Sequence, residues 1–219
     1  MTNKILKYIL ITFCFLIILC GCVTTGKAIY SVNDNYNVLD IGNFEVSISK
    51  RFQYYGISSH RYKGKSTEPE GNTIIYDNHV FIDTSNGKEN VKKVIFVLDK
   101  KLTNHDQYFT KDASFDNYRW RHIEKGVKEV NQVKCAYLVI PIKDISPELF
   151  NANAFKDIKI TQNDTFGLQI KLAKVISNRN IINIIYEEFS NEDYENNSSK
   201  VDSSIKAFES YIRFQKNDH

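Results

Sequence analysis

The sequence predicts an α+β fold, in which a mainly antiparallel sheet is covered by a C-terminal amphipathic helix and by one middle helix. Segments rich in β-branched and aromatic residues recur between residues 43 and 189, as is typical of strands. The last segment instead repeats apolar residues at helical spacing. No repeat, long linker or proline-rich stretch divides residues 36–219, so one globular domain is expected there.

The first predicted strand lies within residues 43–52, where Phe44, Val46 and Ile48 alternate with polar residues. This alternation is typical of a strand with one solvated face. The dense apolar runs at residues 94–98 and 136–140 predict central strands that are covered on both faces. The further strands are expected at residues 72–83, 91–100, 132–142, 166–177 and 179–189.

The middle helix is expected within residues 113–126, although this segment is ambiguous. A helical face would contain Phe115, Tyr118 and His122, whereas a strand face would contain Tyr118, Trp120 and His122. The helix is favoured because Gly126 would be a suitable stop.

The last helix is expected from about residue 199 to residue 215. Its apolar stripe has spacings of four, three and four and should close over the sheet. Ser199 and Asp202 are placed as in a capping box. The residues of the stripe are Val201, Ile205, Phe208 and Ile212.

The N-terminus has the features of a secretory signal. Lys4 and Lys7 precede an apolar run over residues 8–20 with no acidic residue. A helix over this run would rise about 20 Å, short of the roughly 30 Å hydrocarbon core, which disfavours a transmembrane span. A buried N-terminal helix is also disfavoured, because the run has no polar stripe.

Leu19, Cys20, Gly21 and Cys22 follow as a sequence that resembles the lipobox of bacterial lipoproteins. The resemblance covers about the first tenth of the chain. It implies removal of the signal peptide 1–21, attachment of diacylglyceryl to the Cys22 thiol and acylation of the freed amine, commonly with palmitate. Cys20 is the alternative acceptor, but the residue before the cut should be small. Gly21 precedes Cys22, whereas Leu19 precedes Cys20.

The lipoprotein resemblance implies a protein of the bacterial cell envelope that is held to the membrane by its lipid. Two or three acyl chains anchor a protein stably, whereas one chain binds marginally. Val23 stands where, in the enteric-type sorting rule, an Asp would retain the protein at the inner membrane. The periplasmic face of the outer membrane is therefore expected in a Gram-negative source. Residues 22–35 are expected to form a lipidated tether.

The cysteine and charge content argues against a disulfide-stabilised domain and against a nucleic-acid-binding protein. Cys14 and Cys20 leave with the signal and Cys22 is lipidated, so Cys135 remains alone and no internal disulfide can form. Cys135 lies in an apolar run, which favours a buried, inert thiol over a nucleophile. The formal net charge of +3 includes two lysines of the signal, so no nucleic-acid partner is expected.

The order of the predicted elements resembles the PsbP-like α/β sandwich of several small bacterial lipoproteins. The resemblance rests on element order alone. It therefore implies a sandwich and no site residues.

The sequence predicts no catalytic, cofactor-binding or metal-binding residues. Its five histidines have no metal-site spacing, and neither GxSxG nor a glycine-rich phosphate loop occurs. Asp77, His79 and Asp83 share one strand face, where a carboxylate could orient an imidazole base or bind a cation. The favoured interpretation is a solvated face of an edge strand.

Two further segments have polar or aromatic character. The acidic residues lack the spacing of a calcium loop, so a solvated turn is favoured there; they are Glu187, Glu188, Glu192, Asp193 and Glu195. Residues 52–71 are expected to form an irregular loop that either packs ordinarily or recognises a partner. Its candidate recognition residues are Tyr54, Tyr55, His60, Arg61 and Tyr62.

Two functional hypotheses follow. The favoured one is a non-catalytic binding or structural module of the envelope, with an envelope protein or glycan as partner. The alternative is an anchored hydrolase or metal-dependent enzyme whose catalytic residues are dispersed. A concave pocket that gathers His79 or His122 with carboxylates would favour the enzyme.

Overall fold

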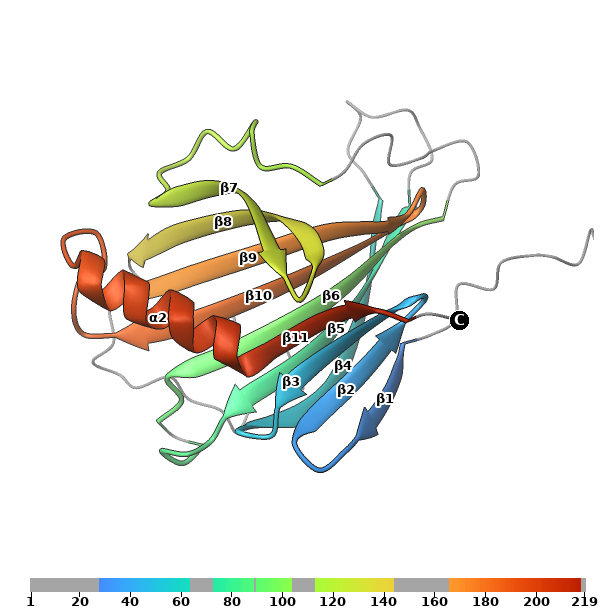
Figure 1. Cartoon of the computed structure of the whole chain (residues 1–219), viewed down its shortest axis with the longest axis horizontal. Helices are drawn as coiled ribbons and strands as arrows, with labels where there is room; N and C mark the ends of the chain where they lie inside the picture. The colour runs from blue at the N-terminus through green and yellow to red at the C-terminus, as the bar shows by residue number, and fades with distance from the viewer. Residues whose placement is uncertain (1–27, 64–72, 89, 104–112, 144–165, 218–219) are drawn as a thin grey trace, which may run out of the picture.

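The computed structural model describes residues 28–63, 73–88, 90–103, 113–143 and 166–217. These residues form two antiparallel sheets and one helix, α2 (Ser198–Tyr211) (Figure 1). In spatial order, the smaller sheet contains β1 (Ile29–Val32), β2 (Tyr36–Ile41), β3 (Phe44–Ser49) and β11 (Ile212–Lys216). The larger sheet contains β4 (Phe52–Lys63), β5 (Thr73–Asp83), β6 (Lys93–Leu102), β10 (Asn180–Ser190), β9 (Phe166–Ser177), β8 (Val133–Lys143) and β7 (Glu124–Val130).

The helix and the smaller sheet cover the same face of the larger sheet. Figure 1 shows α2 lying over β9 and β10 and leading directly into β11 of the smaller sheet. We call the covered face the inner face. The structure is α+β as expected, but strands dominate it more strongly than predicted.

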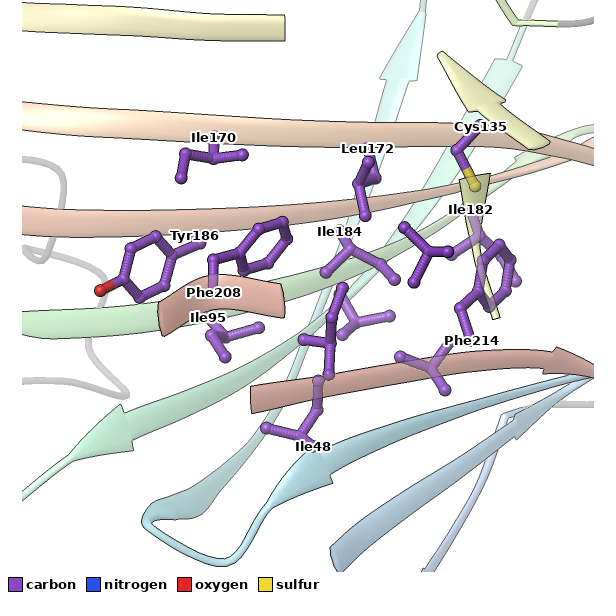
Figure 2. Packing of buried hydrophobic residues seen from close by; sticks show 14 of the residues in the cluster. Ile48, Ile95, Cys135, Ile170, Leu172, Ile182, Ile184, Tyr186, Phe208 and Phe214 are labelled. Atoms are coloured by element: carbon purple, nitrogen blue, oxygen red, sulfur yellow. The ribbon is translucent and has the colours of Figure 1, made fainter. Parts of the chain in front are cut away.

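One apolar core lies beneath both covering elements. Figure 2 shows Phe208 of α2 beside Tyr186 of β10, and their ring centroids are 5.4 Å apart. Ile48 and Phe214 of the smaller sheet belong to the same buried cluster as Ile182 of the larger sheet. Burial of this continuous apolar surface is the main force that holds the two sheets together.

All six strands predicted between residues 43 and 189 are present, as β3, β5, β6, β8, β9 and β10. Phe44, Val46 and Ile48 are buried as the alternation predicts. The run at 136–140 lies in β8, where Tyr137 on one face and Leu138 on the other are both buried.

The predicted middle helix is wrong. Residues 113–123 contain a turn but no helix, and β7 begins at Glu124. Gly126 is not a helix stop, because it pairs with Tyr137 inside the sheet. The Lys125 ammonium instead donates to the backbone carbonyls of Asp116 and Tyr118, which fastens this segment to β7.

The predicted C-terminal helix is correct in place but too long. Val201, Ile205 and Phe208 are buried from α2. Ile212 is also buried, but it begins β11 and pairs with Ile48 of β3. From Ile212 to Phe214, buried and exposed residues alternate with a period of two. This period is that of a strand, and the strand pairs with β3 at the edge of the smaller sheet.

The helix cap also differs from the prediction. The side-chain oxygen of Asn197 accepts a hydrogen bond of 3.1 Å from the backbone N–H of Lys200. Asn197 is therefore the N-cap, and the predicted capping box of Ser199 and Asp202 is not formed.

Two segments expected to be irregular contain strands. Residues 29–32 of the predicted tether form β1, which pairs with β2. Residues 52–63 of the predicted loop form β4, and a bulge between Tyr54 and Gly56 shifts its register. The bulge interrupts the period-two pattern, which is why the sequence gives no clear strand signal there.

The remaining N-terminal predictions fall outside the described residues. These are the signal peptide 1–21, the lipidation site Cys22 and tether residues 23–27. Within the described ranges, no helix is both long and apolar enough to cross a membrane.

Candidate functional site

A group of polar side chains lies on the inner face of the larger sheet, beside the apolar core. Three neighbouring strands supply it, and we call it the His79 cluster. Strand pairing places Asp77 opposite Asp99, and alternation places His79 on the same face as the core residue Phe81. The members are Tyr54 of β4, Asp77 and His79 of β5, and Asp99 and Lys101 of β6.

Tyr54 connects this cluster to the smaller sheet. Its hydroxyl lies 3.0 Å from Nδ1 of His79. Its ring stacks on Tyr30 of β1 with centroids 4.1 Å apart, and it also contacts Phe81 at 5.0 Å. The Tyr30 hydroxyl in turn donates to Oδ1 of Asn37 in β2. Tyr54 and His79 are thus positioned by packing from both sheets.

Lys101 lies close to both carboxylates of the cluster. Its ammonium lies 2.8 Å from Oδ2 of Asp99 and 3.8 Å from Oδ2 of Asp77. Asp77 also accepts a 2.6 Å hydrogen bond from the Ser59 hydroxyl. Burial raises the pKa of the Asp99 carboxyl, and the ammonium of Lys101 opposes this shift.

His79 is 2% exposed, and its burial favours the neutral form of the imidazole. Burial lowers the pKa of its imidazole, while Asp77 acts in the opposite direction and Lys101 lowers the pKa further. A neutral imidazole has one donor and one acceptor nitrogen. Its Nδ1 lies within hydrogen-bond distance of the Tyr54 hydroxyl. Whether Nδ1 donates or accepts in this contact decides whether Nε2 is the acceptor or the donor nitrogen.

Three buried polar atoms of this region have no hydrogen-bond partner among the described residues. They are Nε2 of His79, Oδ1 of Asp99 and Oδ1 of Asn180, whose backbone pairs with Lys101 across β6 and β10. A buried polar group without a partner costs about 1–3 kcal/mol. A buried water is the usual partner of such atoms in folded proteins.

Asp83 belongs to a separate interaction at the other end of β5. Arg51 donates to its Oδ2 at 2.7 Å, and the backbone N–H of Ser85 donates to its Oδ1 at 3.0 Å. Burial raises the pKa of Asp83, but the hydrogen bonds from Ser85 and Arg51 outweigh this effect and lower it overall. The expectation of a solvated edge strand is wrong, because β5 lies between β4 and β6 and buries His79 and Asp83.

The predicted recognition residues do not form one surface loop. Tyr54 belongs to the His79 cluster, whereas Tyr55 packs with a small apolar cluster around Val80. The backbones of His60, Arg61 and Tyr62 continue β4, opposite Tyr76, Ile75 and Ile74. A recognition role for β4 remains a prediction.

The acidic segment is divided among separate interactions. Glu187 lies within β10, is buried and bonds the side-chain amide of Gln169, so it does not belong to a solvated turn. Glu192 pairs with Lys200 at 3.1 Å, and Lys143 pairs with Asp193 and Glu195 at 3.5 and 2.9 Å. Among the described residues, no group of three or more His, Cys, Asp or Glu side chains could hold a metal ion.

Other candidate residues lie apart from the His79 cluster. Cys135 is buried as predicted, and burial raises its pKa to about 12. His122 lies in the segment before β7, with Nδ1 2.9 Å from the carbonyl oxygen of Trp120. A surface hollow of about 460 Å³ is lined without histidine or carboxylate, by Asn131, Gln132, Val133, Gln215 and Lys216.

Sequence reasoning missed Asp99 and Lys101. Both follow Ile95 and Val97 at a spacing of two, which indicates the same strand face. Comparison with protein-family models, curated proteins and solved structures gives no match to this chain.

Proposed function

We propose that this protein is a lipid-anchored lipoprotein of the bacterial cell envelope and that its globular domain is a non-catalytic binding module. The observation that carries the proposal is the sequence Leu19 to Cys22 after a short apolar run. The position of β1 is compatible with it, because Ile29 follows Cys22 by only seven residues in the sequence.

The geometry of the His79 cluster supports binding more than catalysis. A general base must reach a proton of the substrate and must have a pKa near the working pH. His79 is buried and burial lowers its pKa, so it is a weakened and shielded base. The partner class that we propose for the domain is an envelope protein or glycan.

The alternative is an anchored hydrolase. One observation favours it, namely that a histidine oriented by Tyr54 lies near Asp77 and Asp99. Purified protein can be assayed with chromogenic ester and glycoside substrates. Hydrolysis that is lost in His79→Gln and retained in His122→Gln would favour the enzyme over the binding module.

Acyl labelling tests the anchor. Cells that produce Cys22→Ala and are fed labelled palmitate should yield an unlabelled precursor, because the acceptor thiol is missing. Cys20→Ala is the matched control and should still yield labelled protein, because Gly21 and Cys22 are intact. Label that persists in Cys22→Ala would contradict the assignment.

A further inference from the structure

Large apolar side chains are exposed near both outer edges of the larger sheet, around β7 at one end and around β1 and β4 at the other. We call the second of these the β1/β4 edge. Ile29 and Val32 of β1 are 65% and 54% exposed, and Ile57 of β4 is 51% exposed. Tyr30, between the two β1 residues, is 37% exposed. Such a group of exposed apolar residues marks an interaction surface more often than isolated ones do.

These residues belong to one edge although they come from different sheets. β1 and β4 are the outermost strands of the smaller and the larger sheet. The rings of Tyr30 and Tyr54 stack with centroids 4.1 Å apart, so the two strand edges meet there. Figure 1 shows β1 at the rim of the molecule, close to β4.

The length of chain before β1 indicates what covers this edge. Ile29 follows Cys22 by seven residues, and a fully extended chain of this length spans at most about 25 Å. A lipid on Cys22 would therefore keep β1 close to the membrane surface. The opposite end of the larger sheet is β7, which lies six strands away from β4 in the sheet order.

We infer that the β1/β4 edge lies against the lipid bilayer that Cys22 enters, with Ile29, Val32 and Ile57 at the level of the headgroups. Aliphatic side chains and tyrosine are favourable at this depth. The acyl chains supply the anchoring, and the edge sets the orientation of the domain. The β7 edge then points away from the membrane. This inference rests on the proposed lipidation.

Fluorescence quenching in vesicles tests the orientation. The lipidated full chain is reconstituted in vesicles of phosphatidylethanolamine and phosphatidylglycerol that contain a nitroxide-labelled lipid. An environment-sensitive fluorophore is attached to Val32→Cys or, as a matched control, to Val127→Cys of β7, where the valine is 74% exposed. Cys22 is acylated and Cys135 is buried, so the introduced thiol takes the label.

The Val32→Cys label should shift to the blue and lose fluorescence by quenching, whereas the Val127→Cys label should do neither. The single tryptophan, Trp120, is 78% exposed near β7 and should also escape quenching. Quenching of Trp120 or of the Val127→Cys label in place of the Val32→Cys label would overturn the orientation. So would vesicle-bound protein in which no probe is quenched. Protein that washes off the vesicles would instead overturn the lipid anchor itself, together with this inference.

Discussion

At the scale of single residues, His79 shows how a core can hold an imidazole without charging it. The ring of Tyr54 stacks on His79 with centroids 6.0 Å apart, and Tyr30 and Phe81 pack on Tyr54 in turn. The ammonium of Lys101 on the neighbouring strand adds a further cost to a second positive charge. The folded state therefore favours the neutral ring, even though Asp77 lies nearby.

This environment predicts a pH-dependent stability. An unfolded histidine titrates near pH 6.5, as a typical value, and burial lowers the pKa of His79 in the folded state. The unfolded chain therefore gains this proton at higher pH than the folded chain. The free energy of unfolding should therefore fall as the pH is lowered from about 7 to below about 6.5. His79→Gln should lose less stability than the wild type over the same range.

Urea melts at the two ends of this pH range measure the effect. Asp99 and Glu187, whose pKa values are raised by burial, are present in both proteins, so their contributions cancel in the comparison. His122→Gln keeps His79 in place and should retain the wild-type loss. An equal loss in wild type and His79→Gln would contradict the prediction.

The sequence reveals only part of this cluster. Asp77 and His79 could be identified from their even spacing within one strand. Lys100 and Lys101 follow an apolar run, and a lysine pair in that position usually lies in water. The pairing of β6 with β5 and β10 buries Lys101 instead, and strand order is not encoded in any local pattern.

At the scale of elements, the junction of α2 and β11 shows where periodicity succeeds and fails. The helical stripe of Val201, Ile205 and Phe208 was correctly predicted. Ile212 continues that spacing by coincidence, and it also begins the strand alternation of Ile212 and Phe214. A stripe of four apolar residues is too short to show where a helical period gives way to a strand period. Pairing with β3 therefore decides that the chain from Ile212 onward is a strand.

The docking of α2 can be tested by truncation. Phe208 is almost completely buried against Tyr186, so Phe208→Ala should cost about 3–5 kcal/mol of unfolding free energy. Lys206 is exposed on the same helix, and Lys206→Ala should change stability by less than about 0.5 kcal/mol. Denaturant melts of both variants provide the comparison. Similar small losses would mean that α2 does not pack on the sheet.

The start of the helix gives a separate prediction. Asn197→Ala removes the acceptor for the Lys200 N–H and should cost about 1 kcal/mol. Ser199→Ala is the control, because Ser199 would be the cap if the sequence pattern were right. It should cost less than Asn197→Ala in the same melts. A larger loss of stability in Ser199→Ala than in Asn197→Ala would instead support the capping box of Ser199 and Asp202.

At the scale of the whole molecule, the order of the chain joins the two sheets. The smaller sheet is built from the first three strands and the last strand, so its completion requires the C-terminus to return across the larger sheet. α2 makes this connection and buries its apolar face on the way (Figure 1). Local patterns predict most of the strands, but this long-range closure follows only from the packing of the core.

Because one core serves both sheets, the described domain should unfold in a single transition. Phe214 belongs to the smaller sheet and Phe81 to the larger one, and both lie in the same buried cluster. Phe214→Ala and Phe81→Ala should each lower the stability of the whole domain by about 3–5 kcal/mol. Thermal melts of the fragment that begins at Thr24, followed by far-UV and near-UV circular dichroism, should coincide in each variant. Reductant and chelator should leave the melts unchanged, since Cys135 forms no disulfide and the described residues contain no metal-binding group. Two separated transitions in either variant would show that the sheets fold independently, and a shared core could then no longer explain why α2 and β11 close the sandwich.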